Sequence, residues 1–456
     1  MAMQQNGTSA ASVTVAGDVT SGIRAENASA PGTLGEAPVA PFSKAQRRAF
    51  LPVLFLVGTS NYIDKNIIGV LLEQIKAEFQ ASDSMLGMLS GISFALFYAT
   101  FGIPIARWAD HGNRKRIITL SLTVWSLMTM LCGMASTFWQ LAATRFAVGA
   151  GEAGAIPPAQ SLLADYYPPA ERARAIGIFM MSATVGYAVA LVLGGWVTEH
   201  YGWRRTFLVV GLLGLALAPF VHFILKEPRV SSRFAGTSAP AEPMFTTIRA
   251  LMEKSAYRNM LISIVGYFLM SYGAMVFIVS LMMRAHGLTV SQAGTAFGVV
   301  SAIGALVGNL GGGMLADRLA ASDSAWHTRL AGWGMIAAVP FYEIALDAPS
   351  ITVMIPALVL ATILMWAVIP PMFAALHLVC GARRRAMAIA VVFFFANLIG
   401  LGLGPVLAGT MSDIFAVTYG PAEGLRYALM AVVIVFVPAG YFMLRASQHV
   451  KAEAEA

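Results

Sequence analysis

Charged side chains are scarce in this chain of 456 residues, of which only 12% are Asp, Glu, Lys or Arg. That share is about half of what soluble proteins carry. With 57% hydrophobic residues, the chain has too few polar groups to cover a surface in water, so lipid must replace water around much of it. The composition excludes an ordinary soluble domain and predicts a polytopic membrane protein.

Cysteine and the common catalytic motifs are also rare or missing. Cys132 and Cys380 are the only cysteines, both in or beside apolar runs, so we expect free thiols and no disulfide framework. The sequence has no phosphate-binding G-x-x-x-x-G-K-[ST] loop and no His, Cys and Asp grouping with metal-ligand spacing. Its basic residues, despite a net charge of +7, form no single stripe of the kind that binds nucleic acid. We expect no enzymatic activity, cofactor, metal or nucleic-acid partner.

Long apolar runs dominate what is present, each close to the roughly 20 residues that a spanning helix needs. Short polar separators divide them into twelve expected helices. These cover residues 48–72, 84–107, 117–136, 138–164, 173–197, 203–225, 258–283, 291–316, 327–346, 351–379, 385–410 and 424–446. We therefore expect an all-α membrane protein with twelve spanning helices.

One separator, 226–257, is much longer than the others, polar and rich in Pro and Ser before it ends in an amphipathic piece. Such a composition is typical of a linker. It divides the chain into a first group of six helices over 44–225 and a second over 258–446. Residues 1–43 are rich in Ala, Ser, Gly and Thr, which predicts a disordered tail, and 447–456 form a short second tail.

Lysine and arginine are concentrated in alternate separators. The rich set holds Lys44, Arg47, Arg48, Arg114, Lys115, Arg116, Arg172, Arg174, Arg318, Arg329, Arg383, Arg384, Arg385 and Arg445; the poor set holds Lys76, Arg204, Arg205, Arg284 and Arg426. Positively charged loops stay on the cytoplasmic side, so we expect the linker and both termini in the cytoplasm. The expected location is a plasma membrane or a bacterial inner membrane.

The two groups of helices carry equivalent signals at equivalent places. The second run ends in a motif over 102–116, and the eighth ends in a related motif over 313–318. Such repetition predicts two six-helix bundles related by a pseudo-twofold axis. An acidic residue at a helix end that pairs with Arg of the other half would latch one conformation, although local helix capping is an alternative. The latch candidates are Asp110, Arg114, Lys115, Asp317 and Arg318.

Three charged residues lie inside apolar runs, Asp64 in the first and Arg145 and Glu152 in the fourth. An ionised group at membrane depth is costly, so such groups usually face a bundle interior or a water-filled cavity and mark an ion or substrate path. Arg145 and Glu152 are seven residues apart, which places them on one helix face about 10 Å from each other. This placement favours a transporter; a static ion-pair network that fixes helix packing is the alternative.

These motifs resemble the major facilitator superfamily from about residue 44 to residue 446. The motif over 313–318 reads Gly-Met-Leu-Ala-Asp-Arg as in the family, whereas its counterpart departs from the pattern at His111 and Asn113. The resemblance implies two parallel six-helix bundles, usually a monomer, that carry out secondary transport by alternating access.

Three further segments are similar to the Spinster branch of that superfamily: Tyr62-Ile-Asp64-Lys65-Asn66, the glycine-rich stretch from Arg145 to Glu152, and residues 165–175. Lys65 stands where Arg is common in the branch. The resemblance implies an amphipathic lipid substrate, such as a lysophospholipid or a sphingolipid, and coupling to protons.

In the usual arrangement of this superfamily the first and fourth helices line the cavity, so Asp64 can approach Arg145. Arg145 would then pair in turn with Asp64, with Glu152 or with an anionic headgroup. A carboxylate that loses its cationic partner in a low-dielectric site takes up a proton. We therefore expect Asp64 and Glu152 to couple protons and Arg145, Lys65 and Tyr62 to bind substrate.

The carboxy-terminal half has few central charges. Its candidate substrate-binding residues are Tyr267, Tyr272, Trp366 and Asn397, although Tyr and Trp in spans often serve packing or interface anchoring. A cavity that is charged on one side and aromatic on the other suits an amphipathic molecule. The alternatives are a carrier of a small organic anion and a transport-dead receptor or scaffold. We expect Asp413, near a span end, to lie at the membrane interface.

Overall fold

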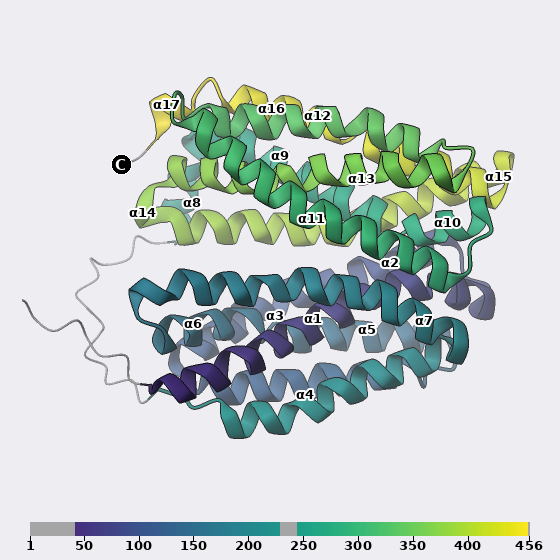
Figure 1. Ribbon diagram of the computed structural model, residues 1–456, viewed down its shortest axis with the longest axis horizontal. Helices are drawn as coiled ribbons and strands as arrows, with labels where there is room; N and C mark the ends of the chain where they lie inside the picture. The colour runs from purple at the N-terminus through teal and green to yellow at the C-terminus, as the bar shows by residue number, and fades with distance from the viewer. Residues whose placement is uncertain (1–41, 229–243, 455–456) are drawn as a thin grey trace, which may run out of the picture. The chain divides into compact units, whose positions relative to one another are not determined.

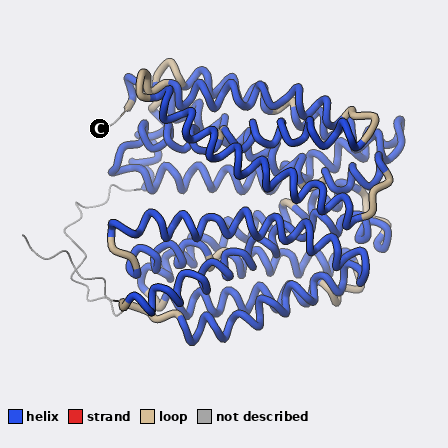
Figure 2. The backbone as a smooth tube through the Cα atoms, viewed as in Figure 1, coloured by secondary structure: helices blue, strands red, loops and turns tan. Residues whose placement is uncertain are grey.

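The computed structural model describes residues 42–228 and 244–454, and every regular element among them is a helix (Figures 1 and 2). Most of the expected tail over 1–43 and residues 229–243 of the expected linker lie outside this described part. The exact domain boundaries stay a prediction.

The amino-terminal half begins with one long helix and ends with two spans that run together. Its helices are α1 (Lys44–Phe79), α2 (Asp83–Ser90), α3 (Ile92–His111), α4 (Arg114–Cys132), α5 (Phe138–Glu152), α6 (Ile156–Tyr166) and α7 (Pro169–Ile224). Inside α7 the chain turns at Gly202, whose φ of 81° lies in the region that only glycine adopts readily. The α2–α3 and α5–α6 pairs each make one interrupted span.

The carboxy-terminal half repeats this plan with turns at Gly381 in α14 and Gly420 in α15. Its helices are α8 (Met244–Glu253), α9 (Ser255–Met275), α10 (Ile278–His286), α11 (Val290–Ala320), α12 (Trp326–Leu346), α13 (Ile351–Ala367), α14 (Ile369–Phe395), the π-helix η2 (Ala396–Leu401), α15 (Gly402–Val433), α16 (Phe436–Ala446) and α17 (Val450–Glu453). Each of the twelve expected runs falls on one of these helices or helix pairs.

By length and composition alone, 7 helical stretches of the described chain could cross a membrane. Two of them, Ala170–Ile224 and Met387–Ala446, contain a turn and hold two spans each. The seven stretches therefore supply nine spans, and α1, the α5–α6 pair and α12 bring the number to twelve. Of these three additional spans, α1 and the α5–α6 pair contain buried charged residues.

The two halves meet where α2 lies against α15 and where α7 lies against α11 (Figure 1). A Cβ atom at Gly87 would collide with the backbone of Pro405, and one at Gly409 would collide with the backbone of Asp83. Such contacts show helix backbones in close approach, as glycine allows in membranes. We call this part of the molecule the closed end.

At the other end, where α1 begins, the ribbons of the two halves lie apart (Figure 1), and we call this part the open end. Gly102 of α3, Gly177 of α7 and Gly311 of α11 all lie nearer to this end, and a Cβ atom added at any of them would enter open space. The close contacts between the halves are thus concentrated at the closed end.

This contrast predicts opposite outcomes for one and the same substitution. Gly409→Ala and Gly311→Ala each remove a helix-propensity cost of about 1 kcal/mol. At position 409 the new Cβ must displace backbone across the interface between halves, and overpacking costs about 1–3 kcal/mol. We expect Gly409→Ala to lower the melting temperature of the detergent-solubilised protein and Gly311→Ala to hold or raise it. Equal shifts in both variants would contradict the close contact of α2 and α15.

Candidate functional site

Asp64 of α1 and Arg145 of α5 form an ion pair in the interior of the amino-terminal half. Arg145 Nη1 lies 3.1 Å from Asp64 Oδ1 and 3.4 Å from the backbone oxygen of Asp64. Thr129 of α4 donates its hydroxyl to the other carboxylate oxygen of Asp64. The side chains of Arg145 and Asp64 are 0% and 1% exposed. The expected approach of Asp64 to Arg145 is confirmed, and it joins three helices.

Arg145 nevertheless uses only part of its hydrogen-bonding capacity. Its Nε and Nη2 atoms are buried and have no acceptor among the described residues. Both carboxylate oxygens of Glu152, at the last residue of α5, are likewise buried without a donor. Asn61 lies beside Glu152, but its amide nitrogen is also unpaired. Buried unpaired polar groups are costly and uncommon, so these atoms of Arg145 and Glu152 are suited to binding a partner reversibly.

The span that carries Arg145 and Glu152 packs closely against both α3 and α4. A Cβ atom at Gly149, Gly151 or Gly154 would collide with Phe94, Trp125 or Ser121, respectively. These glycines therefore allow neighbouring helices to approach closely. The span breaks directly after Glu152, and Pro157 stands in the first turn of α6, where its missing N–H costs no hydrogen bond. Glu152 therefore lies at a break in the span.

Lys65 connects this charged group to aromatic rings of both halves. Its Nζ atom lies 5.1 Å from the ring centre of Phe94 and 5.2 Å from that of Tyr98. It also lies 6.0 Å from the ring centre of Tyr272, which belongs to α9 of the other half. Cations are attracted to ring faces at such distances. Tyr62 interacts electrostatically with Lys65, Glu152 and Tyr272, so four predicted site residues come together here.

Three other predicted substrate-binding residues lie within the carboxy-terminal half. The hydroxyl of Tyr267 donates to the carbonyl of Met365 at 3.2 Å, and its ring stacks on Phe436. The amide of Asn397 donates to the carbonyl of Phe393 at 2.8 Å. These contacts give both residues structural roles, whereas Nε1 of Trp366 is buried without an acceptor in the described chain. A part in substrate binding stays a prediction for all three.

Those latch candidates whose side chains the structure describes form no ion pair between the halves in this conformation. Arg114 pairs inside the amino-terminal half with Asp165 at 2.6 Å and Glu227 at 2.9 Å, and the backbone N–H of Lys115 donates to Glu227. Asp317 and Arg318 are exposed and form no ion pair with any other described residue. The side chain of Asp110 lies outside what the structure describes. A latch across the open end stays a prediction for another conformation.

The closed end holds a charged cluster that the sequence analysis missed. Arg284 of α10 contacts both oxygens of Asp83 of α2 at 2.7 Å and pairs with Glu73 of α1 at 2.8 Å. Lys76 of α1 reaches Asp83 at 2.5 Å. Asp83 is thus held by cations from both halves, and its side chain is only 2% exposed.

Asp413 of α15 adds a second connection at this end. Its carboxylate accepts hydrogen bonds from the backbone N–H groups of Asp83 and Ser84, each at 2.8 Å. These groups belong to the first turn of α2, where backbone N–H groups lack partners within the helix. Asp413 was expected at the membrane interface, which stays a prediction, and its carboxylate caps a helix of the opposite half. The sequence indicates this cluster only through charged residues of both signs at the ends of four spans on the same side of the membrane, namely Glu73, Lys76, Asp83, Arg284 and Asp413.

Thr129 provides a test of how tightly Asp64 is held. A hydrogen bond to a charged group contributes about 1.5–3 kcal/mol, so we expect Thr129→Val to lower thermal stability by that amount. Thr123→Val is the matched control, because the hydroxyl of Thr123 only donates to the carbonyl of Thr119 in its own helix. Differential scanning calorimetry of both variants measures the difference. Equal stability would show that Thr129 does not support the Asp64–Arg145 pair.

Known proteins of similar sequence and structure are membrane transporters. The sequence profile of the Major Facilitator Superfamily matches residues 54–405. An MFS-type efflux pump of Mycolicibacterium smegmatis is 30% identical over 398 residues, which cover 85% of this chain and 90% of the relative. The cis,cis-muconate transport protein of Acinetobacter baylyi is 31% identical over 202 residues, 44% of this chain and 48% of the relative.

A solved structure also matches. It is a bacterial homologue of the human lysosomal transporter Spinster in an inward-facing and unoccupied conformation, with a TM-score of 0.82 and 32% identity over 91% of this chain and 100% of that one.

Proposed function

The chain belongs to the major facilitator superfamily, and we propose that it moves an amphipathic anionic or zwitterionic lipid by proton-coupled alternating access. One observation carries the proposal: Arg145 and Glu152 sit on one helix, fully buried, with unpaired donors on the first and unpaired acceptors on the second. A static packing network would satisfy these atoms. A substrate anion and a proton would satisfy them in turn.

The proposed cycle begins with the present pairing of Arg145 and Asp64. A substrate anion binds the free Nε and Nη2 atoms of Arg145 and weakens the pair with Asp64. Deprived of its cation in a dry site, a carboxyl group takes up a proton. With Asp64 or Glu152 neutral, the site carries less charge while the halves rock to the opposite opening. Competition of this kind suits exchange of substrate for proton.

The walls of the site suit a molecule with one charged and one apolar part. Arg145, Glu152 and Lys65 come from the amino-terminal half, whereas Tyr272 faces them from the carboxy-terminal half. Lys65 and its ring partners could hold a headgroup, and the rings could cover the first methylenes of a chain. The similarity to a probable sphingolipid transporter, spinster homolog 1 of Arabidopsis thaliana, which is 25% identical over 321 residues (60% of this chain and 64% of the relative), supports a lipid substrate.

We further propose that the open end faces the cytoplasm. It holds Arg47, Arg114 and Arg318, and positive loops stay inside. The similarity to an inward-facing structure supports this orientation. The closed end would then face the outside.

Reconstituted transport tests the proposal directly. Proteoliposomes with an imposed pH gradient are supplied with lysophosphatidylglycerol, lysophosphatidylcholine or cis,cis-muconate. We expect gradient-driven movement of a lysolipid by the wild type and its loss in Glu152→Gln. Glu423→Gln is the control, because Glu423 pairs with Arg426 at a half-exposed position outside the site. Unchanged lipid transport in Glu152→Gln would overturn the proton role.

A small organic anion is the second candidate, since the partial likeness to a muconate transport protein favours it. Movement of muconate and of no lysolipid in the same assay would establish that alternative. It would leave the role of Arg145 unchanged, because a carboxylate also pairs with guanidinium.

A further inference from the structure

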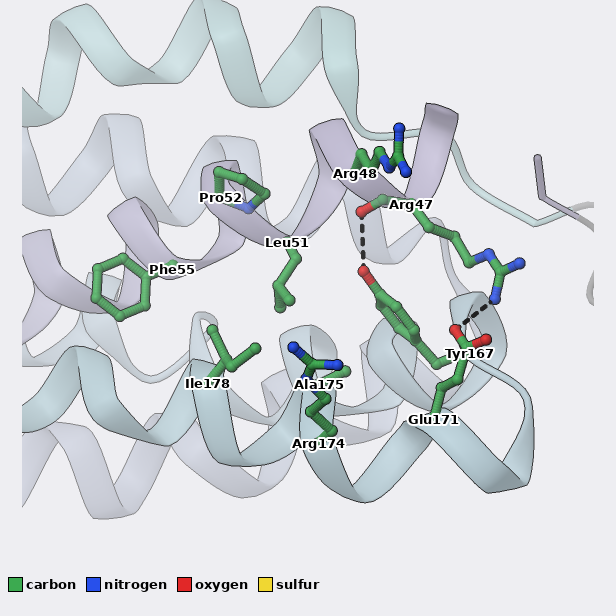
Figure 3. A pocket seen from close by; sticks show the side chains of 10 residues that line it. All are labelled: Arg47, Arg48, Leu51, Pro52, Phe55, Tyr167, Glu171, Arg174, Ala175 and Ile178. Carbon is green, nitrogen blue, oxygen red and sulfur yellow. Dashed lines mark hydrogen bonds and ion pairs between the residues drawn. The ribbon is translucent and has the colours of Figure 1, made fainter. Parts of the chain in front are cut away.

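A groove of 820 Å³ lies at the open end between the first turns of α1 and the start of α7, apart from the buried site (Figure 3). Its lining residues are Arg47, Arg48, Leu51, Pro52, Phe55, Tyr167, Glu171, Arg174, Ala175 and Ile178. None of these belongs to the Arg145 site or to the charged cluster of the closed end. The groove therefore has no role in the cycle described above.

Positive charge in the groove exceeds the negative charge that could balance it. Arg47 pairs with Glu171 at 2.8 Å, yet its Nε atom is buried without an acceptor. Arg48 and Arg174 are exposed and form no ion pair with any residue that the structure describes. Three guanidinium groups thus face one carboxylate, which leaves a net positive site for an anion.

The rest of the groove is apolar. Figure 3 shows Arg47 and Arg48 toward one end and Phe55 at the other, with Leu51 and Ile178 along the walls. From Arg48 to Phe55 the helix advances about 10 Å. That length separates a charged group at a membrane surface from the upper acyl chain beneath it. The groove is thus basic where the headgroup of a membrane lipid would lie and apolar where its acyl chain would lie.

The groove is also formed before any ligand arrives. Tyr167 donates its hydroxyl to the backbone carbonyl of Arg47 at 2.8 Å, which fixes the start of α1 against the turn before α7. A preformed site loses less entropy on binding. The backbone at the Arg47 end of the groove is therefore fixed before a lipid binds.

We propose that this groove binds an anionic phospholipid of the surrounding membrane, with its phosphate between Arg48 and Arg174 and one acyl chain along Leu51, Phe55 and Ile178. The bound lipid would join α1 to α7 at the open end. This site is separate from the transport site, so it does not depend on what the protein carries.

Lipid binding by purified protein tests the site. Native mass spectrometry and microscale thermophoresis compare phosphatidylglycerol, phosphatidylcholine with the same acyl chains, and inorganic phosphate. We expect phosphatidylglycerol to bind best and its affinity to fall with added salt. Arg48→Gln with Arg174→Gln should weaken it at least tenfold, and Phe55→Ser should weaken it without affecting inorganic phosphate. The double variant Arg116→Gln and Arg445→Gln, at exposed sites outside the groove, is the control.

Two outcomes would overturn the proposal. Equal binding of phosphatidylglycerol by wild type and by the Arg48 and Arg174 double variant would exclude the basic rim as the site. Competition by inorganic phosphate at the same concentration as the lipid would show that the apolar wall contributes nothing. Either result can be obtained in a protein that transports normally or not at all, so a failure here is distinguishable from a failure of the proposed transport.

Discussion

Replacing Arg145 with Gln is expected to reduce gradient-driven transport roughly 100-fold, because loss of a buried charge partner costs about 2–5 kcal/mol and each 1.4 kcal/mol is tenfold. Arg145 supplies the only donors that reach Asp64 from α5, and its two unpaired nitrogens are the free cationic donors of the buried site. Without them, neither substrate capture nor the release of Asp64 can occur. Initial rates in proteoliposomes give the size of the loss.

A structural effect of the same substitution must be separated from loss of function. Without Arg145, Asp64 is left buried and unpaired, which destabilises a protein by about 3–5 kcal/mol. Adding Asp64→Asn removes that charge, so the double variant should regain much of its thermal stability but not its transport. Transport at the wild-type rate in either variant would show that Arg145 is a packing residue and that the competition does not exist.

Replacing Arg284 with Met is expected to open the closed end. Arg284 holds Asp83 and Glu73 at once, and its side chain is only 9% exposed. Breaking a buried pair by removing one partner costs about 3–5 kcal/mol, which corresponds to at least a 100-fold shift of a two-state equilibrium. These ion pairs exist only in the conformation in which the halves meet at the closed end, so the substitution destabilises that conformation. Its population should therefore fall.

Spin labels at Ala77 and Tyr419, both exposed near the closed end, report this opening as a longer interspin distance. Cys132 and Cys380 are buried and should not take up label. Arg204→Met is the matched control, because Arg204 pairs with Glu78 within the amino-terminal half. A distance distribution unchanged by Arg284→Met would mean that helix packing alone keeps the closed end shut.

The helical fold could be predicted because lipid constrains the sequence strongly. A spanning segment must satisfy its own backbone hydrogen bonds and present an apolar surface, so every expected run falls on a helix. The break at Gly91 was not predicted, since it depends on how a neighbouring helix approaches. The contact of Asp64 with Arg145 could be predicted, because charges at membrane depth need a partner and the family arrangement brings the two helices together.

The closed-end cluster could not be predicted in the same way. Charged residues at span ends are ordinary, since water and headgroups solvate them there. What distinguishes Asp83, Arg284 and Asp413 is that they are joined across the two halves, and only the folded chain reveals this. The basic groove escaped notice for a similar reason, because Arg48 and Arg174 were counted as topology signals in two separate loops.

The cap that Asp413 places on α2 has a consequence for measuring the transport cycle. The amide protons of Asp83 and Ser84 are covered by an acceptor from the opposite half, so they are shielded from solvent only while the halves touch. Each opening of the closed end would expose them to deuterium. Hydrogen exchange at these two amides is therefore a label-free record of how often the protein visits its other conformation, and substrate or pH should change that rate when they change the cycle.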